Sequence, residues 1–382
     1  MGEQVKRKGP LAGVRIVEMA GIGPGPMAAM LLADLGATII RVDRREKVEL
    51  GIKRPARFNL LNRNREILEV DLKDPAEKAL VLTLVERADA LIEGFRPGTM
   101  ERLGLGPDDC LARNQRLVYG RITGWGQDGP RALTAGHDIN YISITGALDA
   151  IGPQAGPPIA PLNLVGDYAG GALYLAMGIL AAVIEARTSG KGQVVDAAIC
   201  DGVASLMTNF HGMNAAGIHL TQRGENILDG GAPYYGVYMC ADGGYMAVGP
   251  IESRFEADML RILGIDPATM PPRDDRAQWP RGKAIVAAAF LTQDRAYWER
   301  AFDGTDACAS PVLTLVEAVE EPHLAARHTY VEIDGVIQPA PAPRFSRTPP
   351  AAPHGPVTPD NLRALAAWLD PAEIAGLSLA SS

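Results

Sequence analysis

The stretch Val14–Arg44 constrains the fold of this chain more than any other part of the sequence. A short apolar strand at 14–19 runs into a turn rich in glycine and proline, and residues 27–35 then have helical spacing. A second apolar strand follows at 37–42. Strand, turn, helix and strand within about 30 residues form a βαβ unit, which joins two parallel strands by a crossover helix. The sequence therefore predicts an α/β fold built on a parallel sheet.

The same alternation of strands and helices continues to about residue 200. Further strands are expected at 67–72, 90–93, 117–122 and 194–200, and helices at 75–88 and 170–187. The helix at 170–187 is apolar on all sides, so we expect it to be buried. Past Arg223 the pattern changes to a β-hairpin at 234–248, helical stretches near 252–263 and 277–302, and a last helix near 359–369.

This change of pattern divides the chain into a large α/β domain and a smaller α+β domain. A chain of 382 residues with 47% hydrophobic residues is long enough for two cores. The predicted boundaries are 11–200 for the large domain, completed by about 340–375, then 201–225 for a linker helix, 226–315 for the small domain and 316–339 for a linker back to the large domain.

Charge and cysteine content exclude several classes of function. The chain has 37 Lys and Arg against 45 Asp and Glu, a formal charge of −8, which argues against nucleic-acid binding because that requires clustered cations. The four cysteines show no paired or metal-ligand spacing, as expected in a reducing compartment. The apolar stretch 170–184 is shorter than the roughly 20 residues of a membrane span. We therefore expect a cytoplasmic protein with no metal, no membrane and no nucleic-acid partner.

The glycine-rich turn after the first strand invites comparison with a dinucleotide-binding loop. Gly21, Gly23 and Gly25 alternate there, but Pro24 and Pro26 interrupt the pattern and remove backbone N–H donors that would hold a pyrophosphate. The sequence thus argues against NAD. The turn is either a rigid βα connection or one wall of a ligand groove.

The end of the second strand is basic rather than acidic. Arg41 and Arg44 flank Asp43, an arrangement that suits a phosphorylated ribose, such as that of coenzyme A, better than the free ribose of NAD. Arg63 and Arg65 lie nearby in the sequence, as does Lys73, and each taken alone is interpreted as a solvated surface charge.

Two sites carry side chains suited to acid–base chemistry. His137 stands beside Asp138 at the start of an apolar periodic segment, and the positive end of a helix dipole favours a neutral, basic imidazole there. It could equally be a capping or core histidine. Asp167 immediately precedes the apolar helix, either as a plain N-cap or as a carboxyl group held in apolar surroundings.

Seven stretches of the chain resemble the α-methylacyl-CoA racemases of the family III CoA-transferase superfamily. Together they run from about residue 11 to 345, and as a set they are specific. They are 21–26, 41–44, 136–141, 163–167, 190–193, 228–233 and 340–345.

The resemblance implies a Rossmann-like large domain and an interlaced homodimer whose active site lies between the large domain of one subunit and the small domain of its partner. It also implies that His137 and Asp167 are the two catalytic bases, with Asp138 and Glu252 assisting them through hydrogen bonds, Glu252 coming from the second chain. The residues that it assigns to coenzyme A and the thioester are Arg44, Val70, Asp71, Leu72, Lys73, Arg96, Gly136 and Tyr141. One departure is that Pro250 and Ser253 stand near Glu252 where relatives usually have Ala and Pro, which leaves the placement of Glu252 open.

These residues allow inversion of the carbon beside a thioester by proton transfer. One group must remove a proton from one face of the carbon, and another must return a proton to the opposite face. We expect His137 to serve the S face and Asp167 the R face, with no cofactor beyond the coenzyme A of the substrate. The alternative is a family III CoA-transferase, in which the aspartate that corresponds to Asp138 is the nucleophile. His137 directly before Asp138, with Asp167 present, favours the racemase.

Overall fold

The computed structural model describes residues 8–46 and 51–376, which contacts divide into two compact units. The first unit holds the described residues up to Thr145, Leu162–Leu206 and those from Ala326 onward, and the second holds Gly146–Pro161 and Met207–Ala325. Contacts thus place 146–161 and 207–225 with the second unit, whereas the sequence suggested that they belong to the large domain and to a linker helix. Each unit is described by itself.

A six-stranded parallel sheet forms the centre of the first unit. Its strands, in spatial order, are β3 (Arg65–Val70), β2 (Thr38–Arg44), β1 (Arg15–Met19), β4 (Ala90–Glu93), β5 (Val118–Thr123) and β6 (Val194–Ala198). This is the order of a doubly wound nucleotide-binding sheet, in which the direction of winding reverses between β1 and β4. The predicted α/β fold with a Rossmann-like sheet is confirmed.

Helices cover both faces of this sheet. The α-helices of the first unit are α1 (Pro24–Asp34), α2 (Pro75–Val85), α3 (Thr99–Arg102), α4 (Pro107–Arg113), α5 (Asp138–Ser143), α6 (Tyr174–Ser189), α7 (Ile199–Leu206), α14 (Asn361–Ala366) and α15 (Pro371–Ala375). Helix α1 begins at Pro24, three residues earlier than expected from the apolar spacing, because proline fits the first helical position without losing a hydrogen bond.

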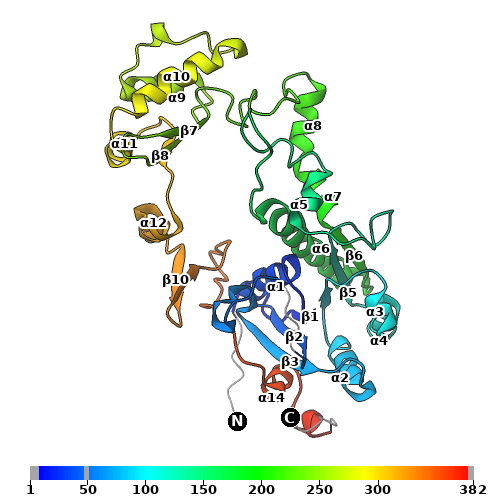
Figure 1. Cartoon of the computed structure of the whole chain (residues 1–382). Coiled ribbons are helices and arrows are strands. Elements are labelled where there is room, and N and C mark those ends of the chain that lie inside the picture. The colour runs from blue at the N-terminus through cyan, green and yellow to red at the C-terminus, as the bar shows by residue number, and fades with distance from the viewer. Residues whose placement is uncertain (1–7, 47–50, 377–382) are drawn as a thin grey trace. The chain divides into compact units, whose positions relative to one another are not determined.

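The C-terminal segment returns to complete the large unit. Helix α14, drawn in red in Figure 1, lies beside β3 at the edge of the sheet. The Asn361 side chain accepts from the Glu69 N–H at 2.8 Å and donates to the Glu69 carbonyl at 3.0 Å, so it satisfies the open edge of the strand. Leu365 and Trp368 are buried in the same core as α2.

Buried ion pairs lie on the α1 face of the sheet. The Arg65 side chain is fully buried and its Nε lies 3.0 Å from the Glu18 carboxylate, which also accepts from Arg41 at 3.0 Å. The Arg63 guanidinium pairs with Asp34 and donates to the Pro339 carbonyl at 2.7 Å. The expectation that Arg63 and Arg65 are solvated is therefore wrong. The cause is tertiary, because α1 and the strand β11 (Val336–Pro339) cover this region, and neither can be recognised as a neighbour from the local sequence.

The apolar helix expected at 170–187 has a different form. Residues Leu164–Leu173 form a π-helix, and α6 continues from Tyr174 to Ser189. By length and composition the stretch Leu164–Ser189 could cross a membrane, but α6 packs along β5 and β6. Its burial is one-sided in this chain, since Met177 and Ile184 are 59% and 69% exposed.

The second unit is an antiparallel sheet packed against helices. Its strands are β7 (Gly236–Met239), β8 (Tyr245–Val248) and β9 (Ala309–Pro311), and the predicted hairpin corresponds to β7 and β8. The helices from this part of the chain are α8 (Thr208–Ala215), α9 (Ser253–Leu263), α10 (Trp279–Phe290), α11 (Arg295–Phe302), α12 (Leu315–Glu320) and α13 (Pro322–Ala326). The chain then forms the hairpin of β10 (Tyr330–Ile333) and β11.

The buried Arg65–Glu18 pair should be important for stability. We expect Arg65→Met to lower the free energy of unfolding by about 3–5 kcal/mol, because it removes one partner of a buried ion pair. The control is Arg113→Met at the exposed Arg113–Glu86 pair, which should cost less than about 1 kcal/mol. Urea unfolding followed by circular dichroism compares the two, and equal midpoints would contradict the structural role of Arg65.

Candidate active site

Several of the predicted coenzyme A residues of the first unit lie at the carboxyl ends of the parallel strands. Arg44 ends β2 and stands opposite Val70, the last residue of β3, in the strand register. The run 71–73, in which Asp71 and Lys73 are exposed and Leu72 is partly buried, follows β3, and the exposed Arg96 follows β4. The carboxyl ends of parallel strands are where such sheets bind ligands. Arg44, Lys73 and Arg96 therefore offer three cations at the edge where a polyanionic cofactor moiety would bind.

Helix α5 presents three of the predicted residues. His137 is its N-cap and is exposed, Asp138 is its first residue and is buried, and Tyr141 lies one turn further on. The Asn140 side chain accepts the His137 N–H at 3.0 Å, which fixes the start of the helix. The imidazole is thus accessible, while the neighbouring carboxylate points into the protein.

Asp138 ties α5 to the π-helix. Its Oδ2 accepts the Asp167 N–H at 2.6 Å and is also bonded by the Gly166 N–H. Burial raises the pKa of Asp138, and these two backbone donors oppose that rise. Its Oδ1 is buried and has no hydrogen-bond partner among the described residues. Asp138 thus accepts hydrogen bonds from the backbone of Asp167 and Gly166, and its expected assistance to the two bases stays a prediction.

Asp167 is not the N-cap that the sequence suggested. Asn163 is the cap, and Asp167 lies within the first turn of the π-helix, half-buried. Burial raises the pKa of Asp167, and the nearby Asp138 raises it further. A hydrogen bond from the Asn163 amide at 3.2 Å lowers that pKa, as does the charge of His137. The charge of His137 therefore acts on the Asp167 carboxyl group.

Glycines allow the backbone to place Asp167. A Cβ at Gly166 would collide with Asp138 Oδ2, and one at Gly23 would lie 3.1 Å from Asp167 Oδ2. Gly23 also has φ 67°, which a glycine adopts readily. The turn between β1 and α1 thus lies against Asp167, and its interpretation as a wall of a ligand groove stays a prediction. A π-helix at this point is consistent with the frequent occurrence of such segments at functional sites.

Tyr141 of α5 packs against the loop that precedes the helix. Its hydroxyl donates to the Gly136 carbonyl, and its ring meets Trp125 edge-on with centroids 4.8 Å apart. A Cβ at Gly136 would lie 2.7 Å from the Tyr141 ring, so only glycine fits there. Burial raises the pKa of Tyr141 to about 12, as do the charges of Asp167 and Asp138, while Arg96 lowers it.

The sequence prediction missed three contributors to this site. Gly23 was named only as part of a turn, Asn163 only as part of a matching stretch, and Trp125 had no role. Asn163 is the one with a usable signal, since an amide four residues before Asp167 can reach it along a helix.

Glu252 lies in the second unit, and its position relative to His137 is not described. It is the exposed N-cap of α9, and its charge raises the pKa of the Cys308 thiol, after burial as the larger cause. Its expected role therefore stays a prediction.

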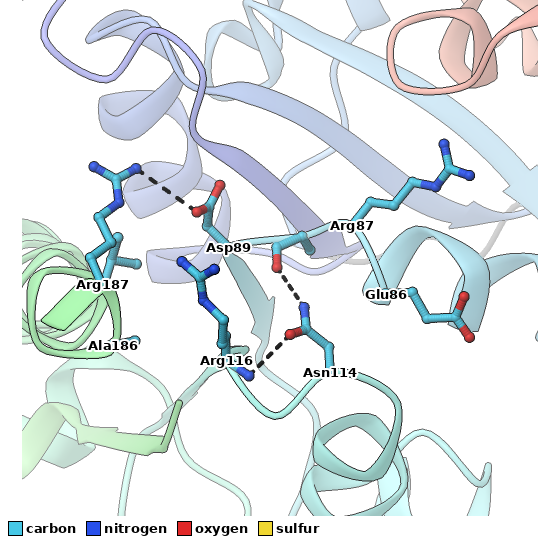
Figure 2. A pocket seen from close by; sticks show the side chains of 9 residues that line it. Glu86, Arg87, Asp89, Asn114, Arg116, Ala186 and Arg187 are labelled. Atoms are coloured by element: carbon cyan, nitrogen blue, oxygen red, sulfur yellow. Dashed lines mark hydrogen bonds and ion pairs between the residues drawn. The ribbon is translucent and has the colours of Figure 1, made fainter. Parts of the chain in front are cut away.

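A hollow of about 260 Å³ lies at the amino-terminal end of the sheet, where β4 and β5 begin. Figure 2 shows Arg187 reaching toward Asp89, 3.8 Å away, and Arg116 bonded to Asn114. Helices α2, α4 and α6 all end near this hollow, and arginines at helix C-termini stabilise the negative end of the dipole. The arginines here are thus accounted for by helix ends.

Comparison with known proteins agrees with the fold and identifies the family. The model of "CoA-transferase family III" matches residues 11–360. The chain is 43% identical to a mouse and 41% identical to a human protein named alpha-methylacyl-CoA racemase, in each case over 89% of this chain and 87% of the relative. A crystal structure of a CAIB/BAIF family protein from Brucella suis superposes with a TM-score of 0.79 at 26% identity, covering 94% of this chain and 98% of that one. The chain belongs to the family III CoA-transferases.

Proposed function

We propose that this protein inverts the configuration of 2-methylacyl-CoA thioesters by 1,1-proton transfer at the carbon beside the thioester. The similarity to proteins named alpha-methylacyl-CoA racemase supports this reaction. The structural observation that carries it is the Asp167 carboxyl group, half-buried with a raised pKa and within electrostatic range of the exposed His137 imidazole. An acid and a base held near one another are what a 1,1-proton transfer requires.

The proposed reaction has two proton transfers. The neutral His137 imidazole takes the α-proton from the S face, and the electron pair of the broken C–H bond moves into the enolate of the thioester. The Asp167 carboxylic acid then gives its proton to the opposite face of the same carbon. A free aspartic acid has a pKa of about 3.9, so the burial of Asp167 serves to keep a proton available. In the R-to-S direction the two groups exchange roles.

The environment of Asp138 argues against the transferase alternative. A nucleophilic carboxylate must expose an oxygen to the acyl carbon, but Asp138 is only 7% exposed and its Oδ2 accepts two backbone N–H groups. In this proposal Asp138 holds the backbone that carries Asp167.

The remaining predictions belong to the same proposal. Arg44, Lys73 and Arg96 bind phosphate groups of coenzyme A, the segment 70–72 lies beside them, and Gly136 and Tyr141 line the thioester. Proton transfer alone needs no metal or redox cofactor. We also propose that the protein is a cytoplasmic homodimer in which Glu252 reaches the site of the partner subunit.

Single substitutions of the two bases should separate exchange from inversion. We expect His137→Ala and Asp167→Ala each to slow inversion about 10²–10⁴-fold, because each removes one acid–base group. In deuterated water, His137→Ala should still exchange the α-proton of the R substrate, and Asp167→Ala that of the S substrate. Proton NMR and chiral chromatography measure the two processes. Asp108→Ala, an exposed acid of α4, is the control and should behave as wild type.

The same experiment tests the alternative reaction. The proposed racemase exchanges the α-proton of a 2-methylacyl-CoA with no acceptor acid present. Wild-type protein that shows no exchange alone, but transfers coenzyme A when a free acid is added, would contradict the proposal.

The pH dependence should be the same in both directions. S-to-R and R-to-S turnover use two tautomers of one singly protonated His137–Asp167 pair, so kcat/KM should follow one bell-shaped profile, lost at low pH when both groups are protonated and at high pH when neither is. The Asn163 hydrogen bond lowers the pKa of Asp167. Asn163→Ala should therefore move the acid limb to higher pH, and an unchanged or lower acid limb would show that Asp167 does not titrate in it.

A further inference from the structure

The segment after β4 that carries Arg96 is anchored at both ends. Before it stands Glu93, the last residue of β4, and after it stands Glu101 in α3. Arg121 of β5 bonds to both, with its Nε 2.7 Å from Glu93 Oε1 and its Nη1 2.8 Å from Glu101 Oε1. A second bond, from Nη2 to Glu101 Oε2 at 3.3 Å, makes the contact with Glu101 bidentate. One guanidinium thus bridges the two ends of the segment 94–100.

The second carboxylate oxygen of Glu93 holds the segment 94–100 at a further point. Glu93 Oε2 accepts the Phe95 N–H at 2.7 Å, one residue before Arg96. Gly106 leaves room for Glu101, because a Cβ at Gly106 would lie 2.8 Å from the Glu101 side chain. Gly98 allows the turn between the anchors, with φ 80°. The segment is therefore fixed at its start, near Arg96 and at its end.

Burying the Arg121–Glu93 ion pair costs desolvation free energy, so a gain in stability is not a sufficient reason for the pair. The side chains of Arg121 and Glu93 are 7% and 1% exposed, and burial raises the pKa of Glu93 against the opposing effects of the Phe95 N–H and Arg121. Buried ion pairs are often no more stabilising than apolar side chains of similar volume. What such a pair does supply is direction, since a guanidinium fork fits carboxylates in a fixed geometry.

We propose that Arg121 is a positioning residue for acyl-CoA binding. By bridging Glu93 and Glu101 it holds segment 94–100 in one conformation, so that the exposed Arg96 guanidinium is already in place for a phosphate group of coenzyme A. This inference rests on the proposed function, and it adds that affinity for coenzyme A depends on a bridge that does not itself touch the ligand. Ordering a segment before binding raises affinity because the entropy cost is removed from the binding step.

The test uses calorimetric titration of the full chain with free coenzyme A. Glu101→Gln breaks one end of the bridge, and since Glu101 is 44% exposed the fold should survive the change. We expect a Kd about tenfold higher than wild type, which corresponds to about 1.4 kcal/mol of binding free energy. The control is Glu86→Gln, which breaks an ion pair of similar exposure, at 40%, on the opposite edge of the sheet. It should leave the Kd unchanged.

A double-mutant cycle distinguishes positioning from a general structural effect. If Glu101 acts through Arg96, then Glu101→Gln should raise the Kd in the wild-type background but have no further effect in the Arg96→Ala background. Arg121→Met should behave in the same way, with a larger rise in Kd. Equal effects of Glu101→Gln in both backgrounds, or none in either, would overturn the inference.

Kinetics add a second readout. Glu101→Gln should raise KM for 2-methylacyl-CoA and leave kcat for α-proton exchange within about twofold of wild type, since the bridge acts on binding and not on the proton transfers. Wild-type protein that binds coenzyme A but fails to exchange the α-proton would contradict the proposed function. It would not contradict the role of the bridge in binding coenzyme A. If instead the effects of Glu101→Gln and Arg96→Ala on the Kd are additive while α-proton exchange is normal, the role of the bridge is contradicted and the proposed function stands.

Discussion

The hydrogen bond from the Asp167 N–H to the Asp138 carboxylate, at 2.6 Å, holds the site together. It joins two segments that reach this edge of the sheet separately, α5 after the loop that follows β5 and the π-helix that leads into α6. Because His137 directly precedes Asp138, this contact brings the backbone of His137 close to the segment that carries Asp167. It also explains why residue 166 is a glycine, since any side chain would occupy the position of the carboxylate.

The charge of Asp138 affects the protonation of the neighbouring Asp167 carboxyl group. Asp138 is buried and bonded to backbone N–H groups, and its charge contributes to the raised pKa of Asp167. Asn163 and His137 act in the opposite direction. A carboxyl group whose environment balances these effects can hold a proton and release it, as acid–base catalysis at neutral pH demands. The protonation of Asp167 thus depends on its surroundings as much as on its identity.

The rest of the sheet supplies the binding edge. Winding reverses between β1 and β4, and the turns after these strands are built from small residues such as Gly23 and Gly94. Cations stand at the ends of β2 and β3 and beyond β4, where the bridge of Arg121 orders the segment that carries Arg96. The candidate site residues of the first unit are thereby held by elements whose geometry the parallel sheet imposes.

The sequence alone determined the α/β class, the βαβ start, the hairpin of β7 and β8, and the residue types at the site, because these follow from local periodicity and from motifs read along the chain. It did not determine that Arg63 and Arg65 are buried, that Asp167 lies inside a π-helix capped by Asn163, or that Asp138 bonds to the backbone beside Asp167. Each of these depends on partners distant in the sequence: Asp34 and Pro339 for Arg63, Glu18 for Arg65, and α5 for the π-helix. Local sequence fixes which groups are present, but burial and hydrogen bonding, which set the charge state of a carboxyl group, exist only once the chain has brought those groups together.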